Sequence, residues 1–117
     1  MGILGVKPTR FYSDKQEKSI VKSVGGKQTS NSGATSFQKG DILTDSFLIE
    51  AKTSTSERNT FSIQKKWLDK MQEEAFAMGK SYSALAFDFG DGVNHYVISE
   101  KLFKILKEHL EREDDLK

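Results

Sequence analysis

Apolar residues recur at helical spacing in three segments of the chain. The first segment, residues 13–24, begins at Ser13, where a serine followed three residues later by Gln16 forms a capping box. The second segment covers residues 62–78, and the third follows Ser99, a serine suited to cap a helix. A glycine comes directly after each of the first two segments, and glycine commonly ends a helix. The pattern therefore predicts three α-helices.

Shorter apolar runs between these helices are typical of β-strands. A hairpin is predicted from residues 42–44 and 47–52, with a two-residue turn between its strands. Two later strands are predicted at residues 83–89 and 95–98, separated by a glycine-containing turn. A further short strand is indicated at residues 60–61. The resulting order, α-β-β-(β)-α-β-β-α, predicts an α/β fold in which a mixed β-sheet is flanked by helices.

The predicted hairpin brings charged side chains together. With Asp45-Ser46 as its turn, Asp41 lies opposite Glu50. Directly opposed residues have Cβ atoms roughly 4.5–5.5 Å apart. Lys52 lies on the same face as Glu50, because alternate side chains of a strand share a face. Two carboxylates at this distance repel each other unless a cation lies between them, and Mg²⁺ takes such oxygen ligands. A register shifted by one residue would instead move Asp41 to the other face.

A Glu-x-Lys pair on a strand is most often part of an ordinary solvated surface. Here Leu48 shares the face of Glu50 and Lys52. The opposite face carries Phe47 and Ile49, so both sides of the strand include apolar residues. A strand covered on both sides rarely carries two charges without a use, because burying an unpaired charge is costly. The local pattern therefore favours a functional site.

The first predicted helix carries an acid on its apolar side. Its apolar stripe contains Ile20, Val21 and Val24, and Glu17 lies three and four residues before the first two. Glu17 is therefore either a boundary residue whose carboxylate reaches water or a member of a functional site.

The residues around the hairpin resemble a known nuclease motif. The pair Gly40-Asp41, followed after a short gap by the run Glu50–Ser54 (EAKTS), resembles the PD-(D/E)xK nuclease core. Gly40 stands where the motif name has proline, a position that varies among such nucleases. More narrowly, residues 13–98 resemble the small Holliday-junction resolvases of archaea and bacteriophages. The resemblance implies a restriction-endonuclease-like fold and a Mg²⁺-dependent endonuclease that cuts four-way DNA junctions.

The resemblance also implies a role for each charged residue. Asp41 and Glu50 would ligate Mg²⁺, or Mn²⁺ in its place, together with the backbone carbonyl of Ala51. Glu17 would hold a second ion or a water molecule beside the first, so that the site takes one ion or two. Lys52 would orient the attacking water or stabilise the phosphate oxygens.

Polar residues around the site are candidates for DNA contacts. Residues 27–39 are rich in Ser and Thr and show no periodicity. They are predicted to form a flexible loop that faces DNA, where archaeal resolvases carry a segment similar to Ser32-Gly33-Ala34. A plain flexible loop is the alternative. The predicted DNA-contacting residues are Lys27, Ser32, Lys39, Gln64, Lys65 and Lys66.

Length and charge agree with one nucleic-acid-binding domain. The 117 residues predict a single domain, residues 1–117, with an N-terminal arm at 1–12 and an acidic tail at 111–117. Residues 1–66 hold 11 Lys and Arg against 6 Asp and Glu, whereas residues 67–117 hold 7 against 11. The positive half contains the candidate site, as electrostatic attraction of DNA requires.

Composition and resemblance together predict the setting and the partners. The chain has no cysteine and no apolar run long enough to cross a bilayer, so we expect a cytoplasmic protein, of a prokaryotic or phage-infected cell, without a membrane partner. The resemblance implies DNA as the partner and a homodimer, since resolvases cut junctions symmetrically with two sites. Two alternatives stay open: another nuclease of this superfamily, such as a phage nicking, flap or repair endonuclease that acts on duplex or flapped DNA, and an inert DNA-binding module.

Overall fold

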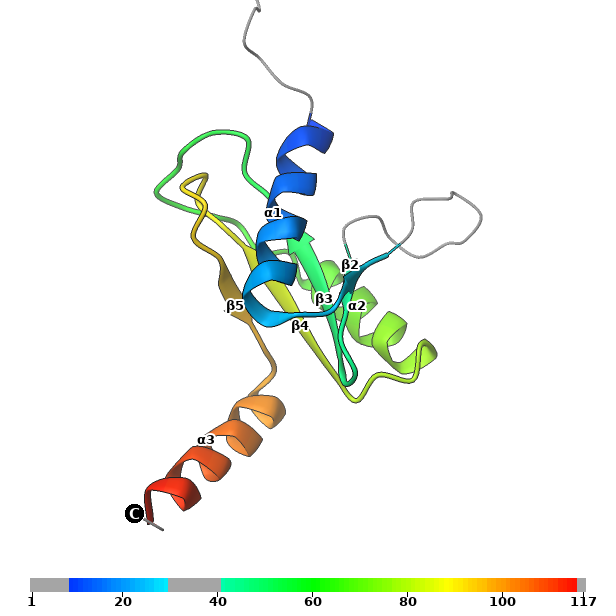
Figure 1. The fold of residues 1–117 in the computed structure, drawn as a ribbon, viewed down its shortest axis with the longest axis vertical. Helices are drawn as coiled ribbons and strands as arrows, with labels where there is room; N and C mark the ends of the chain where they lie inside the picture. The colour runs from blue at the N-terminus through cyan, green and yellow to red at the C-terminus, as the bar shows by residue number, and fades with distance from the viewer. Residues whose placement is uncertain (1–8, 30–40, 116–117) are drawn as a thin grey trace, which may run out of the picture.

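A five-stranded mixed β-sheet forms the body of the protein in the computed structural model, which describes residues 9–29 and 41–115 (Figure 1). The elements in chain order are α1 (Thr9–Val24), β1 (Lys27–Gln28), β2 (Asp41–Leu43), β3 (Phe47–Lys52), α2 (Lys65–Ala77), β4 (Tyr82–Phe87), β5 (His95–Val97) and α3 (Glu100–Asp115). The predicted α/β class is confirmed.

The strands lie side by side in the order β1-β2-β3-β4-β5. β3 and β4 are parallel, and the other neighbouring pairs are antiparallel. Parallel neighbours need a long crossover connection, and α2 provides it between β3 and β4. The carboxyl ends of these two central strands therefore meet at the same edge of the sheet.

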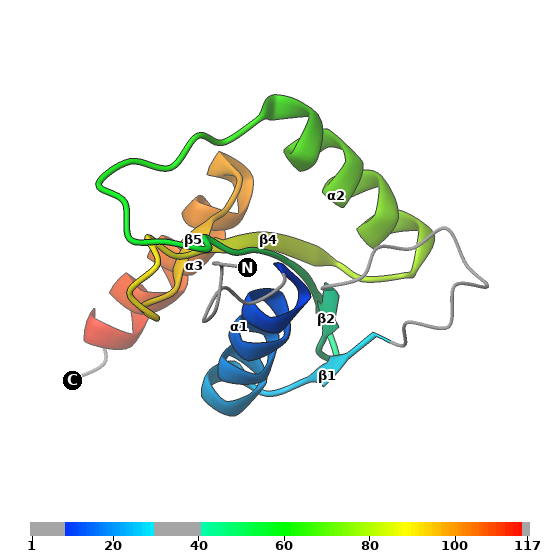
Figure 2. The same cartoon turned by 90° about the horizontal axis from the view of Figure 1, so that it is seen from above.

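The sheet separates two apolar layers. Figure 2 shows α1 on one face of the sheet and α2 on the other. Side chains alternate along β3, so Ile49 packs towards α1 while its neighbour Leu48 packs towards α2. Full burial of an Ile or Leu side chain contributes about 1.5–3 kcal/mol. The buried core residues are Ile20, Ile42, Ile49 and Ala86 on the α1 side, and Leu48, Met71, Ala75 and Leu85 on the α2 side.

The β2–β3 hairpin has the register predicted from the sequence. Asp41 pairs with Glu50, and the turn is closed by a hydrogen bond from the Thr44 amide to the Phe47 carbonyl at 3.0 Å. The Thr44 hydroxyl oxygen accepts a second bond from the Phe47 amide at 2.9 Å. This side-chain bond helps to hold a turn whose Asp-Ser sequence is a weak hairpin former.

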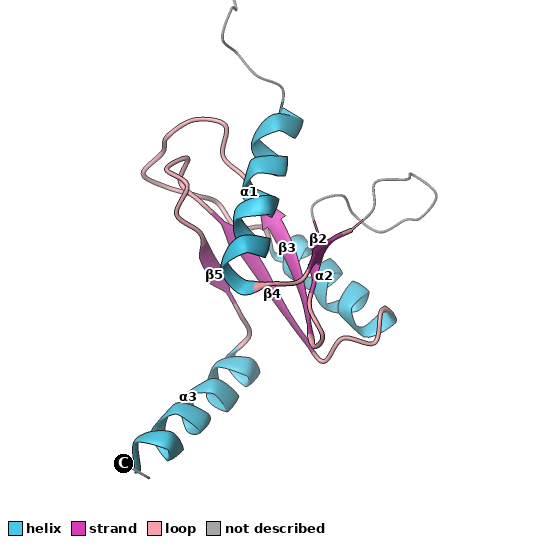
Figure 3. Ribbon diagram, in the orientation of Figure 1, coloured by secondary structure: helices cyan, strands magenta, loops and turns pink. Residues whose placement is uncertain are grey.

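The loops that follow β3 and β4 lie together at one end of the sheet (Figure 3). The Arg58 amide donates to the Phe89 carbonyl at 2.8 Å, and the Ser54 hydroxyl donates to the Asp88 carbonyl at 2.9 Å. Gly90 allows the close approach, because a Cβ atom there would lie 2.2 Å from the Ser56 carbonyl oxygen. The end of β3 is thereby fixed against the end of β4.

Several helix ends also agree with the sequence. α1 ends directly before Gly25 and Gly26, which have positive φ angles of 88° and 93°. Gly79, with φ 72°, follows the last turn of α2, and its amide donates to the Phe76 carbonyl at 3.1 Å. The Ser99 hydroxyl accepts the Leu102 amide at 3.1 Å and caps α3 as predicted.

Other boundaries differ from the prediction. α1 begins at Thr9, not at Ser13, since no helix-breaking residue separates the two. Residues 9–12 are therefore helical and do not form an arm. α2 begins at Lys65 and is not capped by Ser62, because Gln64 adopts the extended conformation, with φ −92° and ψ 133°. α3 continues to Asp115, so most of the predicted acidic tail is helical.

The fifth strand does not lie at residues 60–61, where it was predicted. Residues 60–61 form no strand, and the Phe61 ring stacks on Phe87 with centroids 4.8 Å apart. Lys27 and Gln28, expected in a loop, instead form β1 at the sheet edge, where Lys27 pairs with Leu43. Residues 30–39 of that predicted loop lie outside the described residues.

Candidate metal centre

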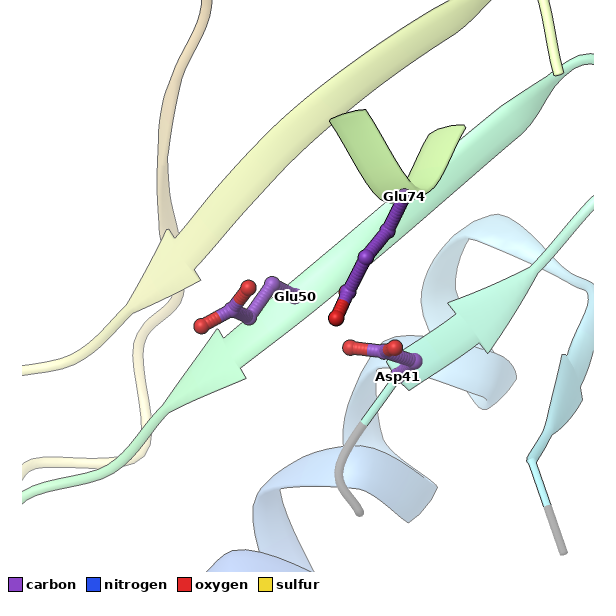
Figure 4. A group of neighbouring side chains, drawn as sticks. All are labelled: Asp41, Glu50 and Glu74. Carbon is purple, nitrogen blue, oxygen red and sulfur yellow. The ribbon is translucent and has the colours of Figure 1, made fainter. Parts of the chain in front are cut away.

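Three carboxylates from three different elements converge beside the sheet. Asp41 begins β2, Glu50 lies opposite it on β3, and Glu74 reaches towards them from α2 (Figure 4). One carboxylate oxygen from each residue lies within 4.8 Å of the others. Opposite ligands of a single Mg²⁺ are separated by roughly 4.2 Å, twice the usual metal–oxygen distance. The cluster therefore has nearly the span of one cation's ligand shell.

Asp41 is the most completely enclosed member of the cluster. It is 0% exposed, and neither of its carboxylate oxygens has a hydrogen-bond partner among the described residues. Burial, which is the largest cause, and the nearby charge of Glu74 raise the pKa of Asp41 from 3.8 to about 8. The charges of Glu50 and Glu17 act in the same direction on this pKa, and that of Lys52 opposes them. When Asp41 is ionised, the negative charge of the surrounding acids is thus only partly balanced by Lys52.

Lys52 supplies part of that charge, on the Glu50 side. Its Nζ forms an ion pair with Glu50 Oε2 at 3.1 Å and lies 4.4 Å from the centre of the Trp67 ring. The ring face attracts the ammonium group and restricts its position. The second oxygen of Glu50, Oε1, is buried and has no hydrogen-bond partner among the described residues. Lys52 therefore neutralises one side of Glu50 and leaves the other side directed into the protein interior.

Glu17 lies next to this group but outside it. Its side chain is 1% exposed, so the alternative that its carboxylate reaches water is wrong. Gln28 Nε2 donates to Glu17 Oε1 at 2.9 Å and thereby links α1 to β1. Glu17 is near enough to raise the pKa of Asp41. It thus belongs to the same electrostatic environment, although the three converging carboxylates are Asp41, Glu50 and Glu74.

The sequence prediction did not include Glu74, although the sequence carries a signal for it. It lies three residues after Met71 and four before Met78, on the apolar stripe of α2. The same observation, an acid on an apolar helix face, had singled out Glu17. Glu74 is 8% exposed and is held against the sheet by its neighbours Met71 and Ala75, which are both core residues.

An open groove of about 640 Å³ leads to the cluster from the surface. Glu50 and Lys52 lie at its inner end, and α2 contributes Lys66, Trp67, Asp69, Lys70 and Glu73 to its lining. The lysines can contact a polyanion that approaches the carboxylates, although Asp69 and Glu73 in the same lining offset part of their charge. Lys66, a predicted DNA-contacting residue, is therefore positioned near the site.

The remaining predicted contact residues are dispersed. Lys27 is exposed on β1, and Gln64 is exposed at the start of α2. Lys65 is engaged by Asp69 at 2.8 Å in an ion pair on the surface. Ser32 and Lys39 lie outside the described residues. The metal-ligand role of the Ala51 carbonyl stays a prediction, and the backbone of Ala51 pairs with Ala86 in the sheet.

The donor set is suitable for a hard divalent cation. All the converging groups are carboxylates, and oxygen ligands suit Mg²⁺, Mn²⁺ and Ca²⁺. A cation would compensate the mutual repulsion of the acids and would give partners to the buried oxygens of Asp41. The buried cluster of Asp41, Glu50 and Glu74 could therefore bind a metal ion.

Comparison with known proteins identifies no relative: no family model, curated protein or solved structure matches the chain. The functional assignment therefore depends on the site itself. Within the described residues, no helix is both long and apolar enough to span a lipid bilayer.

Proposed function

We propose that the protein is a Mg²⁺-dependent, structure-selective DNA endonuclease that cuts four-way junctions, with a restriction-endonuclease-like fold. The observation that carries the proposal is the placement of Asp41 directly opposite Glu50, with Lys52 paired to Glu50 at the inner end of a groove whose lining includes Lys66 and Lys70. Acids that hold a cation beside a lysine are suited to phosphodiester hydrolysis, because the reaction builds negative charge on the phosphate.

The metal would be held by Asp41, Glu50 and Glu74. When bound, a divalent cation lowers the pKa of a coordinated water molecule and neutralises charge on the phosphate. Manganese would substitute for magnesium, since both prefer oxygen ligands. Whether one ion or two would bind depends on Glu17, which lies beside the cluster with one oxygen bonded to Gln28.

Lys52 would act on the substrate. Its ammonium group is fixed between Glu50 and the Trp67 ring, and its side chain is 31% exposed. It can therefore reach a phosphate oxygen in the groove without leaving the site. A compact ammonium with three donors can stabilise charge that develops on such an oxygen, or orient the attacking water.

DNA would enter along the groove beside α2. Lys66 and Lys70 would contact the phosphate backbone there and would fix the position of the duplex without reading its sequence. Selectivity for junctions over duplex would then come from shape. Another nuclease of the same superfamily, a nicking, flap or repair endonuclease, is the second candidate, since this groove would suit duplex or flapped DNA equally well.

The direct test is incubation with a labelled four-way junction and a matched linear duplex, each with Mg²⁺ and with EDTA. The proposal expects paired nicks in the junction, only with the metal. Equal cleavage of both DNAs would favour the second candidate. Absence of cleavage with Mg²⁺ or Mn²⁺ would overturn the nuclease assignment and would leave an inert DNA-binding module.

Replacing the central acids tests which residues carry the activity. Asp41→Ala and Glu50→Ala should abolish cleavage and leave junction binding largely intact, because the lysines of the groove are retained. Glu57→Gln is a control, since Glu57 is an exposed acid in the loop after β3 and does not line the groove. Unchanged cleavage in either alanine variant would refute the site.

A further inference from the structure

The C-terminal helix has an apolar face that the rest of the described chain leaves largely uncovered. α3 projects away from the sheet in Figure 1, and among its side chains that the structure describes only Leu102, near its start, is buried. Phe103 and Leu110 are 59% and 62% exposed, and Ile105 and Leu106 are 40% and 41% exposed. A helix of 16 residues is marginally stable in water by itself, so packing of its apolar face would stabilise it.

Three of these exposed side chains form one stripe. Phe103, Leu106 and Leu110 are separated by three and four residues, which places them on one side of the helix. Lys104 lies on the opposite side and is exposed. The helix is therefore amphipathic along its length, as expected of a helix that packs against a partner.

The apolar surface continues from α3 onto the body of the protein. A hollow of about 560 Å³ lies between α2, β4 and the start of α3, and Ala75, Phe76, Leu102 and Ile105 contribute to its wall. Phe76 is 86% exposed, the highest value among the large apolar side chains of the described residues. Exposed apolar surface is therefore present on the body of the protein beside the start of α3.

The charges along α3 identify the partner. Residues 100–107 carry three lysines against one glutamate, whereas residues 108–115 carry five acids against one arginine. The helix dipole favours the opposite distribution, with acids near the N-terminus and bases near the C-terminus. Glu100 and Arg112 do suit the dipole, but the net charge of each half opposes it.

A second α3 that runs in the opposite direction accounts for this distribution. Its acidic half would lie against the basic half of the first helix, and the same contact would repeat about a two-fold axis. In a parallel pair, like charges would face each other. We propose that α3 is the self-association surface of this protein, and that it pairs antiparallel with α3 of a second copy through the stripe of Phe103, Leu106 and Leu110.

The pairing can be tested on the full-length protein without any assay of nuclease activity. Sedimentation equilibrium should show a concentration-dependent dimer that weakens as salt rises, because salt screens the charge contacts. The double variant Leu106→Gln/Leu110→Gln should raise the dimer dissociation constant at least about tenfold. Lys22→Gln, at an exposed position on α1, is the control and should leave the constant within about twofold. Circular dichroism would verify that each variant retains its helix content.

The direction of pairing can be tested by cross-linking, because the chain contains no cysteine. Lys101→Cys and Arg112→Cys place single thiols near the two ends of α3. A short bismaleimide should link a mixture of the two variants more efficiently than either variant alone. Preferential linking within each single variant would show a parallel pair and would overturn the proposed arrangement. Weak self-association is detectable at about 100 μM protein. A wild-type protein that stays monomeric at that concentration would overturn the interface itself.

Discussion

Asp41 lies directly opposite Glu50 across the antiparallel β2–β3 pair, and both side chains are almost fully buried. Two acids in this relationship repel each other, and Glu74 brings a third carboxylate to the same place. Lys52 balances Glu50 only on one side. Repulsion between these carboxylates destabilises the folded protein when no cation is bound, and a bound cation would compensate it. This difference is the physical basis of the proposed metal centre.

The contribution of Glu74 can be measured by metal binding. Glu74→Gln removes one carboxylate of the cluster without changing the size of the side chain. We expect Mg²⁺ or Mn²⁺ affinity, measured by calorimetry, to fall roughly 10- to 100-fold, as for other groups that support a metal site. Glu73→Gln removes an exposed acid at the next position of α2 and should leave the affinity nearly unchanged. Equal effects of the two substitutions would mean that Glu74 is no ligand.

Lys52 should affect catalysis more than it affects DNA binding. Lys52→Gln removes the ammonium group that pairs with Glu50, and we expect cleavage of a junction to slow by roughly 100-fold or more. Lys70→Gln removes the same charge from the wall of the groove, away from Glu50. It should weaken binding by a few-fold, and single-turnover kinetics at saturating enzyme should show little change. A Lys52 variant that cleaves at the wild-type rate under those conditions would refute the role.

The stability of the metal-free protein should fall as the pH rises. Asp41 has a pKa of about 8 in the folded protein, against a usual value of 3.8. Between these values the folded state keeps a proton that the unfolded chain has released, so the free energy of unfolding decreases by at most about 1.4 kcal/mol per pH unit. Above about pH 8 this loss is complete.

Urea unfolding in EDTA between pH 5 and pH 8.5 measures this dependence, in the range where the two states differ in protonation. Asp41→Asn should flatten it, because asparagine does not titrate. Addition of Mg²⁺ should restore stability mainly at the higher pH, where Asp41 is ionised. A free energy of unfolding that rises with pH in EDTA would contradict the environment described for Asp41.

Gly26 should be far less tolerant of substitution than Gly25. Both residues have positive φ angles, so alanine is strained at either position. At Gly26 a Cβ atom would also lie 2.7 Å from the Leu43 carbonyl oxygen, whereas at Gly25 it would meet no atom within 4 Å. We expect Gly25→Ala to cost about 1 kcal/mol and Gly26→Ala to cost about 2–3 kcal/mol or more in urea unfolding. Equal losses would mean that the turn after α1 does not pack closely against β2.

The sequence by itself determined the central hairpin and its charges. Alternation along residues 47–52 and the two-residue turn place Asp41 opposite Glu50, and the structure has this register. These relationships are local, because a strand orients its side chains by a fixed period of two residues. The glycines after α1 and α2, and the serine before α3, marked helix ends for the same local reason.

Only the tertiary structure decided the rest of the site. Glu74 joins the cluster because the crossover between two parallel strands lays α2 across the face that carries Glu50, and no local rule gives that placement. The burial of Asp41 and the raised pKa that follows depend on elements distant in the chain. β1, with no apolar alternation of its own, forms because β2 offers it an open edge to pair with. Pairing and burial of this kind depend on neighbours in space, whereas the sequence records only neighbours along the chain.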